Sequence, residues 1–227
     1  MEAEKIKFFT LMTEYHRHEK DAFELAKDYH YIYSTFCVQN KQEEWMEALK
    51  SSVLFLVLSP YSREQQDMLN RVNVDSNLQK IETCKNVVKL FLTKEILHHP
   101  LPQQAEMEGF EAFNMGDDGL SEHWKGTFKK RIIQHDVRVA AMYYRRIHGK
   151  RLAELLRLSP SELEAEIANM VSNGDVYAKI DRPNDIIRFA QKKAPEAVLS
   201  DWADDISTLL TLVDKTTHLI HKEKMTH

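Results

Sequence analysis

Apolar residues recur every three or four positions along most of the chain, which is the spacing that places them on one face of an α-helix. Before residue 97 this pattern predicts three long helices and two shorter ones, joined by short links. Successive helices of this kind are typical of stacked helical hairpins. Residues 1–97 are therefore expected to form a mainly α, helical-repeat (TPR-like) solenoid.

Glycine and proline mark one loop in the sequence. No glycine precedes Gly109, and three of the six glycines fall between residues 98 and 120, together with Pro100 and Pro102. Both residue types interrupt regular structure. We therefore expect residues 98–120 to be a loop that divides the chain into two parts.

A different order of elements follows this loop. A long helix is expected from Ser121 to Arg146, with inward side chains at Phe128, Ile132, Val139, Met142 and Tyr143. A short strand, two helices joined by a turn, and two wing strands come next, at 147–149, 151–156, 160–173, 176–181 and 185–189. This order predicts a winged helix with a small β wing over residues 121–194.

The helix predicted over 160–173 carries glutamates where a DNA-reading helix would carry arginines. Ser159 and Glu162 have the spacing of a capping box, and Asn173-Gly174 supplies a left-handed stop. Its apolar face is Leu163, Ile167, Met170 and Val171, its polar face is flanked by Glu164 and Glu166, and it contains no Lys or Arg. Because neutralisation of phosphates supplies most of the affinity of DNA-binding proteins, this helix is a poor groove reader.

A last helix is predicted over residues 195–227. Its apolar positions follow steps of three and four, which is the seam of a coiled coil: Leu199, Trp202, Ile206, Leu209, Val213 and Ile220, with Thr216 in the gap. Such a helix can fold back on its own domain. The pattern favours the alternative, a bundle with helices from other chains.

Charge and composition add limits. The formal net charge of −4 gives no overall attraction to nucleic acid or to an anionic membrane. The longest apolar run, Val53–Leu58, is too short to span a bilayer, and the first residues lack a secretory hydrophobic region. Cys37 and Cys84 are expected to be buried free thiols of a reducing compartment, so we predict a cytoplasmic and nuclear protein.

The two signs of charge are segregated along the chain. Residues 125–151 contain nine bases and one acid, whereas residues 160–205 contain ten acids and five bases. The basic helix can pair with the acidic wing and tail of its own domain, or with a neighbouring chain. Pairing within the domain is favoured.

Catalytic and metal-binding patterns were sought, and none was found. The sequence has no phosphate-binding glycine loop, no nucleophilic serine elbow and no cysteine pair at zinc spacing. His16-x-His18 is followed by Ala26 and Tyr29 where a zinc-dependent deubiquitinase motif requires Ser and Asp. His218 and His221 lie one turn apart without a third ligand at a compatible spacing. We predict no catalytic residue, no metal and no cofactor.

Several motifs resemble the proteasome-lid members of the PCI-domain family. They are Arg131–Asp136 leading to Tyr143-Tyr144-x-Arg146-Ile147, Lys150–Leu156, Ala178–Pro183, and Leu212–Glu223 in the tail. One departure is His135-Asp136, where the family usually has His-Asn. Family members are also about twice as long and begin with a further helical solenoid. This sequence is therefore expected to correspond to their C-terminal half.

The resemblance implies a non-catalytic scaffold of the proteasome regulatory particle. It implies partners among the other PCI lid subunits, no membrane, and no nucleic acid. Family winged helices associate side by side, and their C-terminal helices gather in one bundle. The residues expected at the winged-helix contact are Tyr177, Ala178, Ile180 and Asp181, and those expected in the bundle are Leu209, Val213, Thr216 and Ile220.

Two alternatives stay open at this point. The same fold in the COP9 signalosome is one, because its fourth subunit has a similar domain. The other is a PCI domain that binds RNA through the basic 125–151 helix.

Overall fold

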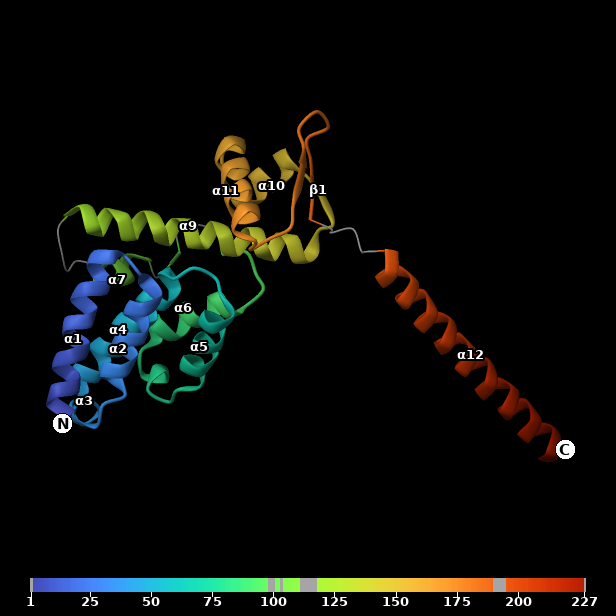
Figure 1. The fold of residues 1–227 in the computed structure, drawn as a ribbon, viewed down its shortest axis with the longest axis horizontal. Coiled ribbons are helices and arrows are strands. Elements are labelled where there is room, and N and C mark those ends of the chain that lie inside the picture. Colours follow the sequence, from blue (N-terminus) through green and yellow to red (C-terminus); the bar gives the residue numbers. More distant parts are fainter. Residues whose placement is uncertain (1, 98–100, 103, 111–117, 190–194, 227) are drawn as a thin grey trace. The chain divides into compact units, whose positions relative to one another are not determined.

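A computed structural model describes residues 2–97, 101–102, 104–110, 118–189 and 195–226 of the chain (Figure 1). The chain divides into two units, one of residues 1–189 and one of residues 190–227. The first unit contains a helical part and a winged helix. The second contains a single long helix.

The helical part is a stack of antiparallel helices around α4. Its elements are α1 (Glu2–Glu19), α2 (Ala22–Tyr33), α3 (Phe36–Gln39), α4 (Gln42–Leu58), α5 (Arg63–Val74), the 3-10 turn η1 (Leu78–Lys80) and α6 (Glu82–Leu92). Every residue from 51 to 58 is buried, because α4 is covered by α2, α5, α6 and α9. The predicted helices are confirmed. Lys20, with φ 61°, ends α1, and the Asp21 carboxylate caps α2 by accepting the Phe23 N–H at 3.0 Å.

The segment expected to be a loop contains a helix. Residues Gln104–Glu108 form α7, and Met107 is buried within the core of the helical part. The long helix that follows, α9 (Asp118–Tyr143), also begins three residues before the expected Ser121. The glycines and prolines therefore bound a short helix here. Residues 98–100, 103 and 111–117 of the predicted loop lie outside the described residues.

Helix α9 is shared between two hydrophobic cores. Trp124, Phe128 and Ile132 pack with the helical part, whereas Val137 and Ala140 belong to the core of the winged helix. The buried face therefore changes partner along the helix. The prediction that Met142 and Tyr143 point inward is wrong, since both are exposed at the end of α9, where neither core extends.

The winged helix is built from β1 (Arg146–His148), α10 (Gly149–Leu156), α11 (Pro160–Asn173), β2 (Lys179–Asp181) and β3 (Ile186–Arg188). The strands form an antiparallel sheet in the order β1-β3-β2, in which Ile147 and Ile180 both lie opposite Ile187. The first predicted strand is present one residue earlier than expected, and the two wing strands are present but shorter than expected. The buried Ile187 packs on the helices with Leu152, Leu163 and Met170.

The second unit is α12 (Pro195–Thr226), where a single helix was predicted from Pro195 onward. Across the residues described, no helix combines the length and apolar character that crossing a membrane requires.

Both cysteines are free thiols, but only Cys84 is buried; the expectation for Cys37 is wrong. Cys37 lies on the exposed short helix α3, and its thiol donates to the Glu2 carboxylate at 2.8 Å.

Candidate protein–protein interfaces

Sequence-encoded caps set the bounds of α11, which supports the wing. The Ser159 hydroxyl accepts the Glu162 N–H at 3.3 Å, and the Glu162 carboxylate accepts the Ser159 N–H at 3.2 Å, so the predicted capping box is present. The Ser159 hydroxyl also donates to the Glu162 carboxylate at 2.7 Å, and this bond, together with the one from the Ser159 N–H, lowers the pKa of Glu162. At the other end Gly174 has φ 81°, the left-handed conformation that glycine adopts at no steric cost. Both ends of α11 are therefore fixed by local chemistry.

Asp185 holds the wing turn against the start of α10. Its backbone carbonyl accepts the Gly149 N–H at 3.0 Å, and its carboxylate accepts the Lys150 N–H at 3.1 Å. A Cβ on Gly149 would lie 2.5 Å from the Asp185 carboxylate, so a larger residue here would push this side chain away from its bond to the Lys150 N–H. These two bonds give the wing a defined position on the helix-turn-helix. Asp185 makes them from a left-handed backbone conformation, with φ 50°.

A buried chain of polar contacts joins the winged helix to the helical part. The Gln134 amide donates to the Glu166 carboxylate at 2.7 Å and accepts from the Arg131 guanidinium at 2.6 Å. Arg131 also donates to the Leu58 carbonyl at 2.9 Å. Glu166 is therefore buried, not on the flank of the polar face, and this expectation is corrected. Val171 is corrected in the opposite sense, since it is exposed near the end of α11.

The residue at which the sequence departs from the family pattern has a structural contact. Asp136 is buried and its carboxylate accepts the Leu97 N–H at 2.8 Å, which ties the segment after α6 to α9. An asparagine at this position has a carbonyl oxygen that can accept the same bond. The substitution therefore keeps the acceptor and changes only its charge.

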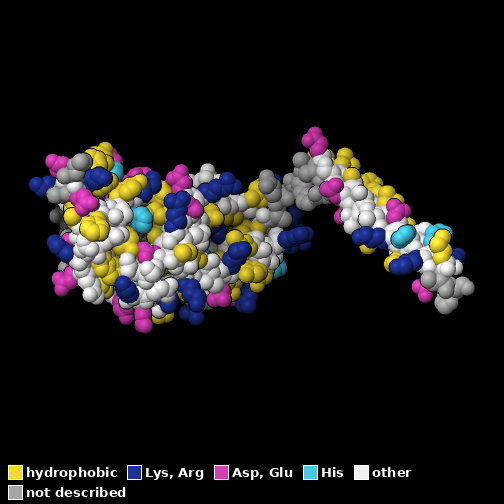
Figure 2. Space-filling view, turned by 90° about the horizontal axis from the view of Figure 1, so that it is seen from below, with side chains coloured by type: hydrophobic (Ala, Val, Ile, Leu, Met, Phe, Trp, Pro, Cys, Tyr) yellow, Lys and Arg dark blue, Asp and Glu magenta, His cyan; other side chains and the backbone are white. Residues whose placement is uncertain are grey.

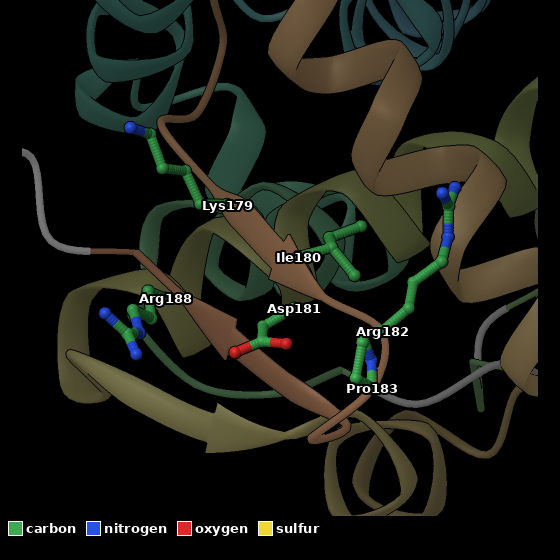
Figure 3. A pocket seen from close by; sticks show the side chains of 6 residues that line it. All are labelled: Lys179, Ile180, Asp181, Arg182, Pro183 and Arg188. Carbon is green, nitrogen blue, oxygen red and sulfur yellow. The ribbon is translucent and has the colours of Figure 1, made fainter.

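The four predicted wing residues lie on and just before β2, which is an edge strand. Tyr177 and Ala178 precede β2 and are half-buried, while Ile180 and Asp181 are within it. Ile180 shares its sheet face with the buried Ile187 and lines a pocket against Pro160 and Leu163 of α11. Asp181 leaves β2 in a different direction from Ile180 (Figure 3). No further strand of the described chain pairs with β2.

A row of basic side chains that the sequence pattern does not predict crosses the outer face of the sheet. Arg146 lies opposite Arg188, and Arg188 lies opposite Lys179. All three are exposed, although like charges directly opposite each other destabilise a sheet. The strand register, which brings these residues together, is not readable from one sequence. Lys179 and Arg188 line the same open hollow on this face (Figure 3).

Part of the basic stretch 125–151 is used inside the domain. The Arg138 guanidinium lies 4.2 Å from the centre of the Tyr61 ring, and Arg131 joins the polar chain described above. Burial lowers the pKa of both guanidinium groups. On α11, Glu164 accepts from Arg182 of the wing turn at 2.7 Å. Other bases of the stretch are exposed, among them Lys125, Lys129, Lys130, Arg145 and Lys150.

Helix α12, taken by itself, presents a continuous row of apolar side chains (Figure 2). Leu209, Val213 and Ile220 are exposed on it, and Thr216 fills the gap as predicted. Successive residues of an α-helix are rotated by about 100° around the helix axis. On this geometry the apolar row covers a wider part of the helix surface than the seam expected from steps of three and four. Its flanks carry further exposed leucines that the sequence analysis omitted: Leu210 on one side, and Leu212 and Leu219 on the other. A band this broad matches contact with more than one neighbouring helix.

Titratable groups in the first unit are shifted by burial. Burial raises the pKa of the Cys84 thiol to about 12 and, together with the nearby Arg138, lowers the pKa of His135 to about 4. Among the described residues, no group of three His, Cys, Asp or Glu side chains has the arrangement of a metal site. The features that stand out are therefore surfaces, the β2 edge and the α12 band.

Two family models match the sequence, one over the range that contains β2 and one over α12. Residues 108–191 match the PCI domain, and residues 196–227 match the 26S proteasome regulatory subunit RPN5 C-terminal domain. The 26S proteasome regulatory subunit RPN5 of Saccharomyces cerevisiae is 33% identical over all of this chain. The chain is homologous to proteasome RPN5 subunits. The 26S proteasome non-ATPase regulatory subunit 12 of Dictyostelium discoideum is 36% identical over 98% of the chain.

These matches cover only part of the relatives. The chain spans about half their length, 51% of the yeast protein and 49% of the Dictyostelium protein. COP9 signalosome complex subunit 4 of Caenorhabditis elegans also matches, at 23% identity over 87% of the chain and 45% of that protein. The identity to proteasome subunits is higher and extends over more of the chain. The proteasome interpretation is thus favoured over the signalosome alternative.

Proposed function

We propose that the chain is a non-catalytic scaffold subunit of the 26S proteasome regulatory particle lid. In this role it assembles with other PCI subunits and supports ubiquitin-dependent protein degradation in cytoplasm and nucleus. The observation that carries the proposal is the pairing of a PCI domain with an RPN5 C-terminal domain, the latter on the helix with the broad apolar band. The proteasome relatives are named regulatory subunits, which supports a role without chemistry of its own.

Two surfaces divide the work of assembly in this proposal. The β2 edge contacts the winged helix of a neighbouring PCI subunit, either by pairing with a strand of its sheet or by packing against its helices. The residues of this edge are Tyr177, Ala178, Ile180 and Asp181. The α12 band, centred on Leu209, Val213, Thr216 and Ile220, packs in a bundle with C-terminal helices of lid subunits. The lack of Lys and Arg on α11 supports protein partners over DNA for the winged helix.

The test is the identity of the proteins that co-purify with the tagged chain, measured by mass spectrometry. Proteasome lid subunits are expected, and signalosome subunits in their place would support the alternative complex. A variant with Leu209→Ser, Val213→Ser and Ile220→Ser should lose the lid subunits. The matched control is Asp204→Ser, Thr211→Ser and Lys215→Ser, which lie on the other side of α12 and should leave recovery unchanged. Equal loss in both variants would contradict the bundle contact.

A further inference from the structure

The free edge of β2 has a sequence that is complementary to itself. Lys179, Ile180 and Asp181 form the whole strand, with a positive charge at one end, a negative charge at the other and an isoleucine between them. In an antiparallel pair of strands, the residues directly opposite each other lie on the same face of the sheet. Two copies of β2 aligned on Ile180 therefore place Lys179 of each copy opposite Asp181 of the other.

We propose that this edge pairs with the β2 edge of a second copy of the chain, which joins the two sheets into one. Such a contact is isologous, so the Lys179–Asp181 pair occurs twice and Ile180 faces its own counterpart across the two-fold axis. Lys179 is exposed, whereas Asp181 is half-buried and accepts a hydrogen bond from the exposed Asn184 amide at 3.0 Å, which the pairing would have to share or replace.

The residues on either side of β2 suit the same alignment. It directs Tyr177 and Ala178, which precede β2, toward Arg182 and Pro183 of the other copy, where the chain leaves the strand. Pro183 lacks an N–H, but it lies in the turn after β2 and is not needed for the ladder. The pairing is therefore confined to the three strand residues, and the flanking residues 177, 178, 182 and 183 bring no like-charge contact to it.

The charge pattern favours a second copy over an anionic polymer. The Arg146–Arg188–Lys179 row attracts negative charge, and a nucleic acid strand or a polyacidic peptide would meet it. Either would also bring negative charge next to Asp181, two residues away on the same face. A second copy offers an acid opposite Lys179 and a base opposite Asp181. The second copy also places the carboxylate of its Asp181 at the Lys179 end of the basic row, whose like charges repel one another.

This pairing goes beyond the proposed function, and it does not rest on it. The dimer would be a state of the chain outside the lid, and it would occupy the edge that we assign to a neighbouring PCI subunit. Its formation depends on β2 and not on the α12 band. The two proposals can therefore fail separately.

The test is sedimentation equilibrium of the full chain over a wide concentration range. Lys179→Asp and Asp181→Lys should each weaken dimerisation by about tenfold or more, because each turns both ion pairs into like-charge contacts. The double variant should restore the dimer, and mixing the two single variants should give a heterodimer. Lys179→Asp replaces a like-charge contact with Arg188 by an opposite-charge one, so this variant is not expected to weaken the sheet of its own chain.

A charge reversal away from the β2 edge is the control for these variants. Lys150→Asp changes the same charge away from the β2 edge and should leave the dissociation constant unchanged. The chain with the three serine substitutions in α12 should give the same pattern as the unmodified chain. A monomer at every concentration would overturn the proposal. So would a dimer that does not respond to the single reversals, or a double variant no tighter than the single ones.

Discussion

The polar chain Leu58–Arg131–Gln134–Glu166 makes a strong prediction about how the winged helix is held on the helical part. Gln134→Leu keeps the size of the side chain and removes both of its hydrogen bonds, to Glu166 at 2.7 Å and to Arg131 at 2.6 Å. Gln134 is 4% exposed and Glu166 is 8% exposed, so water cannot replace these bonds without opening the contact.

The size of the effect follows from these two charged partners. A hydrogen bond to a charged group contributes about 1.5–3 kcal/mol, and Arg131 is only half-buried, so the second bond counts for less. We therefore expect Gln134→Leu to lower the free energy of unfolding by about 2–4 kcal/mol. Fluorescence of the buried Trp124 on α9 follows the unfolding in a denaturant titration.

Two further variants decide the cause of this loss. Gln79→Leu, the same substitution at an exposed position, should change stability by less than about 0.5 kcal/mol. Gln134→Leu combined with Glu166→Leu should recover part of the loss, because no buried carboxylate is then left without its donor. A loss below about 1 kcal/mol in Gln134→Leu would refute the view that this chain holds the two parts together.

Three other predictions concern the first unit. His135 has a pKa of about 4 in the folded chain against an ordinary value of 6.5. The unfolded chain therefore binds the proton first, so stability should fall as the pH drops from 6.5 to 4, and His135→Gln should remove about 2–3 kcal/mol of that dependence in titrations at both pH values. Arg157 ends α10 with φ 55°, so Arg157→Gly should stabilise the chain by about 0.5–1 kcal/mol in thermal melts, while Gly174→Ala at φ 81° should destabilise it by a similar amount. Neither the unmodified chain nor the variant Lys129→Glu, Lys130→Glu should bind an RNA column at low salt. Retention of the unmodified chain that this variant abolishes would support the RNA alternative. Arg131 is left unchanged because it is part of the polar chain to Gln134.

Much of the fold could be predicted because its signals are local. The capping box at Ser159 and the stop at Gly174 depend on neighbouring residues, and both lie where the sequence puts them. The periodicity of α9 was less informative, because the helix serves two cores in succession and its buried face does not follow one line. The exposure of Met142 and Tyr143 is a consequence of that change.

The surfaces were harder to predict than the elements. Glu166 looks like a surface carboxylate in the sequence, and only the position of Gln134 on another helix shows why it is buried. The basic row on the sheet joins residues from three strands, so it depends on register and not on any contiguous motif. The predicted residues at the β2 edge and in α12 stay predictions, because partners decide their role.

Truncation tests the central claim most directly, that the chain enters the proteasome lid through α12. The full chain and a chain ending at Ser207 are compared for co-migration with lid subunits on a density gradient, with Trp124 fluorescence to check that the first unit is folded. The account predicts that the full chain migrates with the lid and that the truncated chain, still folded, migrates alone. A folded, truncated chain that enters the lid as well as the full chain does would contradict it.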